Sequence, residues 1–146
     1  MTMDESTAAG LRERGLKVTP RRLAVARLLR SRRGAMTPEA VWQRLRPALG
    51  SLGLPTVYRI LEDLVEAGLL TRVDLGDQVR RYAACRARRG SHHHHTVCVG
   101  CGSVGELSDC PVEREVRRLE RRTGFRVLSH RLQVEGLCAK CRRARK

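Results

Sequence analysis

The chain has 146 residues, and 30 lysines and arginines against 15 acidic residues leave a formal net charge of +15. This length suits one ordinary domain or two small ones, and the positive charge favours a polyanionic partner, above all nucleic acid. Aromatic residues make up only 3% of the chain, which argues against base-stacking surfaces for single strands. No apolar run approaches the roughly 20 residues that span a bilayer.

The N-terminus and the cysteines together indicate the compartment. The first ten residues lack the basic-then-apolar profile of a secretory signal, so we expect a cytoplasmic protein of the bacterial type with no membrane partner. In that reducing environment the six cysteines are expected to bind metal rather than to form disulfides.

Three short helices are predicted in the first half of the chain, after a frayed segment over residues 1–10. Pro20 suits the first turn of one helix. Thr37 is a good N-cap for the next helix, which should end before Pro47. The third helix, over residues 54–68, has apolar side chains at helical spacing. Three short helices in succession indicate a helix-turn-helix.

A β-hairpin is predicted directly after these helices. Residues 70–74 and 79–82 favour strands, and Gly76 and Asp77 lie between them as a turn. A hairpin in this position is the wing of a winged helix, which we predict over residues 10–83.

The second half of the chain has a different pattern. Short strands are predicted at residues 96–99 and 104–107, followed by a helix that Pro111 opens and an alternating strand over residues 125–135. This unit is too small to hold its own core, so bound metal and a partner subunit would both help it to fold.

The predicted fold class is therefore α+β. It consists of an N-terminal winged helix-turn-helix domain over residues 1–83, a hinge over 84–91 and a small C-terminal α/β domain over 92–146.

Two Cys-x-x-Cys pairs flank the C-terminal unit, and thiolates at this spacing are typical zinc ligands. A four-sulfur zinc site should join the last strand of this unit to its first. Structural zinc contributes on the order of 10–16 kcal/mol in small peptides, so the domain should unfold without it. The four residues are Cys98, Cys101, Cys138 and Cys141.

Four consecutive histidines, His92 to His95, precede the first cysteine pair. On an extended segment alternate side chains point to opposite faces, so His93 and His95 would serve one site and His92 and His94 another. The run could also be the scar of an expression tag.

Three further residues are candidate ligands with simpler alternatives. His130 could be a core histidine, and Glu113 an acid that matches the helix dipole. Cys85 lies in the predicted hinge, within reach of the histidines. A sixth cysteine, Cys110, precedes Pro111 and is interpreted as a small residue at the helix start.

The start of the third helix carries the candidate DNA-reading residues. Arginine can reach phosphate or guanine, and tyrosine can pack on a thymine methyl group or bind phosphate; the alternative is a solvated helix face. The candidates are Thr56, Tyr58 and Arg59, with Lys17 and Arg21 as further phosphate or minor-groove contacts.

Three motifs then resemble one known family. The chain contains GLPTVYRILEDLVEAGLL, HHHHTVCVGCG and GFRVLSHRLQVEGLCAKC in this order, and this combination resembles the ferric uptake regulator family of metal-dependent bacterial repressors over about residues 11–142. The resemblance implies a homodimer, a winged helix that binds a palindromic operator in double-stranded DNA, and a C-terminal α/β dimerisation domain. Metal loading would close the hinge and so match the two reading heads to the operator.

The resemblance also implies three metal sites. The four paired cysteines match the family's structural zinc site, and Cys85, His93 and His95 match a regulatory site at the hinge. The dimerisation-domain site falls on His92, His94, Glu113 and His130. The Tyr-Arg pair of the family's recognition helix falls on Tyr58 and Arg59, and its basic N-terminal contact falls near Lys17.

Departures from the family pattern indicate the metal. Ala35 stands where iron-type members have a histidine, and the thiol of Cys85 resembles the zinc-responsive branch, because sulfur favours zinc. Thr71 stands where zinc-type members often have an acid, so Asp74, Asp77 or a water molecule could supply the fourth donor. Zn²⁺ is therefore expected in both roles, with Fe²⁺ or Mn²⁺ as alternatives at the regulatory site.

Four hypotheses follow. The first is a metal-responsive repressor with no catalytic residues and no small-molecule substrate. The second is a zinc hydrolase, although no acid lies beside the histidines as a general base. The third is a constitutive DNA-binding protein whose metals are all structural, and the fourth is a peroxide sensor of the same family.

Overall fold

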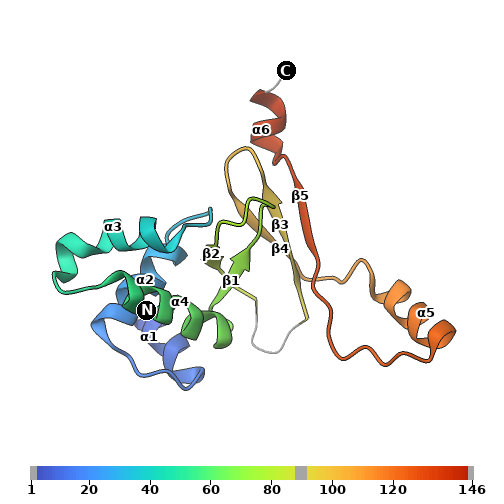
Figure 1. The fold of residues 1–146 in the computed structure, drawn as a ribbon, viewed down its shortest axis with the longest axis horizontal. Helices are drawn as coiled ribbons and strands as arrows, with labels where there is room; N and C mark the ends of the chain where they lie inside the picture. Colours follow the sequence, from blue (N-terminus) through green and yellow to red (C-terminus); the bar gives the residue numbers. More distant parts are fainter. Residues whose placement is uncertain (1–2, 88–91, 145–146) are drawn as a thin grey trace.

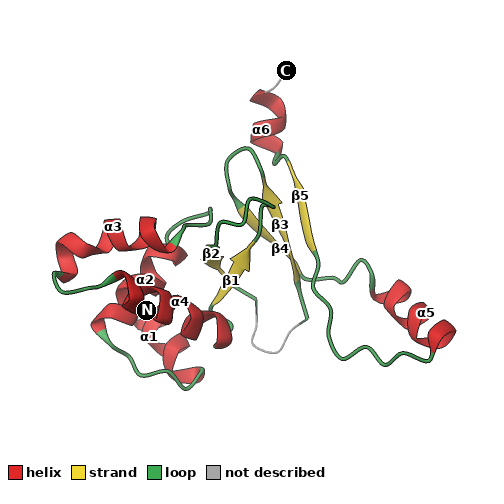
Figure 2. Ribbon diagram, viewed as in Figure 1, coloured by secondary structure: helices red, strands yellow, loops and turns green. Residues whose placement is uncertain are grey.

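The structure, a computed structural model, describes residues 3–87 and 92–144. Figure 1 shows a group of helices at the N-terminal end, a central region of strands, and a helix, α5, that projects away from the strands on the other side. Figure 2 shows that the two small sheets lie next to each other between these helical parts. Among the described residues, no helix is long and apolar enough to cross a membrane.

The chain begins with a helix that the sequence did not predict. Helix α1 spans Met3–Glu13, where a frayed segment was expected. Leu11 is fully buried and Thr7 is 1% exposed, so packing against the rest of the domain orders the segment. This burial is tertiary in origin, and the short apolar pattern of residues 1–10 did not reveal it.

Three helices follow, α2 (Pro20–Arg30), α3 (Pro38–Leu49) and α4 (Leu54–Glu66). The predicted N-cap of α3 is confirmed, because the Thr37 hydroxyl accepts a hydrogen bond from the Ala40 N–H at 3.1 Å. The predicted end before Pro47 is wrong. Pro47 lies inside the last turn of α3, where a missing N–H removes only one intrahelical bond close to the helix end.

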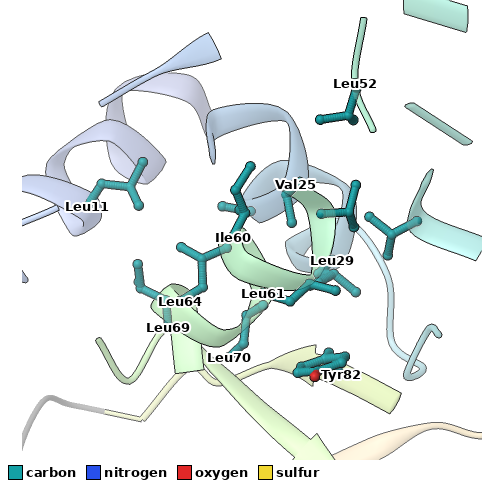
Figure 3. Close-up of a cluster of buried hydrophobic side chains, with 13 residues drawn as sticks. Leu11, Val25, Leu29, Leu52, Ile60, Leu61, Leu64, Leu69, Leu70 and Tyr82 are labelled. Carbon is teal, nitrogen blue, oxygen red and sulfur yellow. The ribbon is translucent and has the colours of Figure 1, made fainter. Parts of the chain in front are cut away.

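The hydrophobic core of the N-terminal half joins all four helices to the first sheet (Figure 3). Tyr82 of the sheet is fully buried within it. The buried members are Leu11, Val25, Ala26, Leu29, Val41, Leu52, Val57, Ile60, Leu61, Leu64, Leu69, Leu70 and Tyr82.

The first sheet is the predicted hairpin. Strands β1 (Leu70–Val73) and β2 (Arg81–Ala84) are antiparallel, and the winged-helix prediction is confirmed. Strand β2 begins two residues later than expected because the Asp77 carboxylate accepts hydrogen bonds from the Val79 N–H and the Arg81 guanidinium. These bonds hold the tip of the hairpin in a turn.

The second sheet has the strand order β4-β3-β5. Strands β3 (His94–Cys98) and β4 (Val104–Leu107) are antiparallel, and β5 (Gln133–Gly136) is parallel to β3. Helices α5 (Glu113–Thr123) and α6 (Ala139–Ala144) complete the chain. The predicted helix start at Pro111 is thus two residues early.

The long strand expected over residues 125–135 is only partly formed. Residues 124–132 are irregular, and the Phe125 and Leu128 side chains are 64% and 86% exposed. Alternating apolar residues become a strand only where another strand pairs with them. Among the described residues, such a partner is found only for Gln133–Gly136, which pair with β3.

The two halves of the chain contact each other directly. An isolated β-bridge joins Gly34 to Ser103, and the Val104 N–H donates to the Arg33 carbonyl at 2.8 Å. The Asp74 N–H also donates to the Gln133 side chain. Of the predicted hinge over 84–91, residue 84 ends β2 and residues 88–91 lie outside the described part of the chain.

Candidate metal centres and nucleic-acid interface

The four paired cysteines converge at one end of the second sheet. Cys98 ends β3, Cys101 lies in the following turn, and Cys138 and Cys141 lie at and within the start of α6. Their sulfur atoms all lie within 4.8 Å of one another. The turn must be tight here, because a Cβ atom added at Gly100 would lie 3.1 Å from the Cys141 sulfur.

The charges of these thiols explain why the cluster suits a cation. The Cys138 N–H donates to the Cys98 sulfur at 3.2 Å, and this hydrogen bond lowers the pKa of Cys98 to about 6. Hydrogen bonds with the other three sulfurs raise the pKa of Cys141 to about 12. Four sulfurs at this separation cannot all ionise unaided, whereas a divalent ion would stabilise four thiolates. The residues therefore fit structural zinc.

A second cluster lies between the two sheets. The Cys85 sulfur, which directly follows β2, lies 3.1 Å from Nε2 of His93, and His95 of β3 completes a group with ligand atoms within 4.8 Å. His95 Nε2 is buried and makes no hydrogen bond in the described part of the chain. Burial lowers the pKa of His95, which favours the neutral imidazole that binds metal. An unpartnered buried nitrogen beside a thiol is well placed for zinc.

The acids expected to complete this second cluster are engaged elsewhere. The Asp74 carboxylate accepts the Gly76 N–H at 2.8 Å, and the Asp77 carboxylate binds Arg81. Asp77 has its pKa lowered to about 2, chiefly by that hydrogen bond with Arg81.

Glu106 is the acid that the sequence analysis missed at this cluster. It pairs with His95 in the register of β3 and β4. Burial raises the pKa of Cys85, and the negative charge of Glu106 adds to that rise. The same charge partly offsets the lowering of the His95 pKa by burial. Only the pairing of the two strands reveals this neighbour, and their register was not available from the sequence.

A third cluster contains His92, His94 and His130, as predicted. Nε2 of His92 lies 2.9 Å from Nε2 of His130. His94 is 1% exposed, and burial lowers its pKa. The fourth member is Cys110, whose sulfur lies 3.2 Å from Nε2 of both His94 and His130.

The expected fourth ligand of this third cluster, Glu113, is not brought into it. Glu113 lines the same pocket, but its carboxylate forms an ion pair with Arg117, one turn further along α5. Cys110, interpreted from the sequence as a small residue at the helix start, is brought by the fold to His94 and His130. A cysteine 16 residues from one histidine and 20 from another gives no local signal, since only the fold brings them together.

The candidate DNA-reading residues lie on the N-terminal half as expected. Arg59 of α4 is exposed, and Thr56 and Tyr58 are half-buried at the start of the same helix. The Tyr58 hydroxyl donates to the Glu39 carboxylate at 2.7 Å, and this bond raises the pKa of Tyr58. Tyr58 is thus held by α3.

Lys17 and Arg21, the two further candidates, are both exposed near the start of α2. The Arg21 guanidinium donates to the Ser51 hydroxyl at 2.9 Å, which leaves its remaining N–H groups able to reach a phosphate.

The chain matches known proteins over most of its length. The sequence profile of the Ferric uptake regulator family matches residues 13–135. The ferric uptake regulation protein of Bacillus subtilis (strain 168) is 35% identical over 126 residues, which cover 86% of this chain and 85% of that protein. A solved structure of a zinc uptake regulator complexed with zinc and DNA is 28% identical, with a TM-score of 0.82 and 99% of each chain covered. The holo form of XcZur is 29% identical, with a TM-score of 0.75 over 95% of this chain and 96% of that one.

Proposed function

Because this chain belongs to the ferric uptake regulator family, we propose that it is a dimeric transcriptional repressor that binds a palindromic operator when loaded with zinc. Members of this family are regulators rather than enzymes, so the zinc hydrolase alternative is set aside. The observation that carries the proposal is the second cluster, in which Cys85 meets His93 and His95.

This cluster joins the two functional halves of the chain. Cys85 follows the wing strand β2, whereas His93 directly precedes β3 and His95 lies within it. Zinc bound here would hold the end of the wing against the second sheet through bonds to sulfur and imidazole. A ligand that binds better to one conformation shifts the population toward it, so these three residues make the closed arrangement dependent on zinc. We name them the hinge cluster.

Glu106 is the acid best placed to assist the hinge cluster. Its strand faces β3, and its carboxylate accepts a hydrogen bond from the Arg86 N–H, next to Cys85. In that position Glu106 either ligates directly or offsets the charge of the ion. Sulfur among the donors favours zinc over iron or manganese, and for this reason we propose zinc as the regulatory metal.

The exposed apolar residues of the C-terminal half support a dimer. Large exposed apolar residues on a small unit mark a surface that another protein covers. Helix α5 has no buried residues within the described chain, and its Leu119 is 47% exposed. We propose that a second copy covers these exposed apolar residues, which are Leu119, Phe125, Leu128 and Val134.

The N-terminal half would supply the contacts to DNA. In a winged helix the second helix of the helix-turn-helix enters the major groove, which here is α4 with Thr56, Tyr58 and Arg59 at its start. Lys17 and Arg21 would bind phosphate groups. Two such heads in a dimer read two half-sites. We further propose that residues 1–83 form the reading head, that 84–91 form the hinge, and that the protein acts in the cytoplasm.

Zinc-dependent DNA binding tests this function. Protein that retains its structural zinc is used to select a duplex from a random-sequence pool in excess zinc, and affinity for that duplex is then measured across a zinc titration. Allosteric coupling should raise the affinity by about 5- to 150-fold. If the affinity for the duplex changes by less than about twofold across the titration, well below that range, DNA binding is constitutive. Iron- or manganese-specific activation, or loss of binding after peroxide treatment, would assign the chain to another branch of the family.

A further inference from the structure

The third cluster contains a thiol that nothing in the family resemblance led us to expect. We propose that Cys110 is its fourth metal ligand, so that the site is built from three imidazoles and one thiolate and is selective for zinc. The inference deepens the proposed function, and it rests on that function only in taking zinc as the ion bound in the cell.

The geometry brings the Cys110 sulfur next to the imidazoles of the cluster. Its sulfur lies 3.2 Å from Nε2 of His94 and 3.2 Å from Nε2 of His130, while His92 Nε2 lies 2.9 Å from that of His130. All four ligand atoms lie within 4.8 Å of one another. Four convergent donors at this separation match the size of a tetrahedral zinc site.

Glu113 is the alternative ligand, and its surroundings argue against it. Its side chain is 59% exposed and paired with Arg117, whose side chain is 66% exposed. Metal binding by Glu113 would compete with that ion pair, whereas the Cys110 sulfur already lies beside two of the imidazoles. The loop before α5 also favours the cysteine, because the helix begins only at Glu113 and leaves Cys110 outside it.

The donor set decides the class of ion. Imidazole and thiolate ligands suit zinc and other borderline or soft ions, whereas carboxylate favours manganese and harder ions. Replacing an expected carboxylate with a thiolate therefore shifts the site toward zinc. Binding releases the thiol proton of Cys110 to solvent, because the thiolate is the form that ligates.

The cluster also ties three separate segments together. His94 lies on β3, Cys110 follows β4, and His130 lies in the irregular segment that precedes β5. This segment carries Phe125 and Leu128, which belong to the proposed dimer surface. A metal held by Cys110 would therefore order the dimer surface in addition to filling its own site.

Cobalt(II) is the probe that tests the ligand directly, because thiolate bound to cobalt gives a near-ultraviolet charge-transfer band. The starting protein is full-length Cys85→Ser with its structural zinc in place, so that the hinge cluster contributes no thiolate. We expect cobalt to bind with the charge-transfer band and a tetrahedral visible spectrum. Adding Cys110→Ser should abolish the band, and the matched control Glu113→Gln should keep it.

Metal competition gives a second readout. Loss of one residue that hydrogen-bonds to a metal ligand costs about 10- to 100-fold in metal affinity. Loss of a ligand itself, in Cys110→Ser, should therefore weaken zinc binding by at least about 100-fold. The affinity for manganese should change far less. Structural zinc content confirms that each variant is folded. A band that persists in Cys110→Ser, or cobalt binding that is lost in Glu113→Gln but kept in Cys110→Ser, would overturn the proposal. These spectra need no DNA, so the proposal can fail while zinc-dependent DNA binding stands, and the reverse also holds.

Discussion

The two halves of this molecule are stabilised by different means. The N-terminal half encloses thirteen buried hydrophobic residues in one cluster, whereas the described C-terminal half contributes only Val97 and Cys98 to the buried hydrophobic residues. In place of apolar burial, its described residues form two groups of His and Cys side chains that could bind metal, and they share a third such group with the N-terminal half. A half with its own core can keep its fold while its orientation changes. In a half that depends on bound metal, both the fold and the orientation respond to the metal.

The largest difference in stability between the halves should follow from substitution of the four-cysteine cluster. The pair of substitutions Cys98→Ser and Cys141→Ser removes a site of the kind that is worth on the order of 10–16 kcal/mol. Hydrogen exchange should show that β3, β4 and β5 lose protection while α2, α3 and α4 keep theirs. Equal loss of protection in both halves would mean that they fold as one cooperative unit.

The second prediction destabilises the N-terminal core and leaves the metal clusters unchanged. Leu61 is fully buried, and Leu61→Ala should lower the free energy of unfolding by about 2–5 kcal/mol through lost burial and a residual cavity. Thermal or urea unfolding measures the loss, and the structural zinc content should stay the same. Arg59→Ala on the exposed face of the same helix is the control, with little change in stability. A parallel loss of zinc in Leu61→Ala would argue that the halves depend on each other.

The surface proposed to meet a second copy gives a smaller effect that is confined to the C-terminal half. Leu128 is 86% exposed, and Leu128→Asp should weaken dimerisation by about 2 kcal/mol if the residue is an interface hot spot. Sedimentation equilibrium measures the change. Arg131→Asp, which changes an exposed polar position nearby, serves as the comparison. An unchanged dissociation constant in Leu128→Asp would place the interface elsewhere.

The smallest effect concerns a single helix cap in the N-terminal half. Thr37→Ala removes the hydrogen bond to the Ala40 N–H and should cost about 1 kcal/mol of stability. Thr37→Ser keeps the oxygen and should restore most of the loss in urea denaturation. A Thr37→Ser protein as unstable as Thr37→Ala would show that the methyl group, rather than the cap, stabilises α3.

Sequence reasoning succeeded where local chemistry determines the structure. The cap at Thr37 and the cysteine spacing were predictable because the interacting groups lie within a few residues or follow a known ligand pattern. Glu106 was missed because the register of β3 and β4 brings it opposite His95. Cys110 was missed because the tertiary fold brings it to His94 and His130, which are distant in the sequence. The order of α1 depends on the burial of Leu11, and the irregular segment around Leu128 lacks a strand partner, so neither could be read from local pattern.

The central claim is that zinc at the hinge cluster controls DNA binding, and the double variant Cys85→Ser, His93→Ala tests it most directly. Affinity for the selected duplex is measured with and without added zinc, in wild type and variant. As a control, the two proteins must have the same structural zinc content and the same affinity for the duplex without added zinc. We predict that zinc strengthens wild-type binding at least about fivefold and leaves the variant unchanged. A variant that responds to zinc as the wild type does would contradict the account.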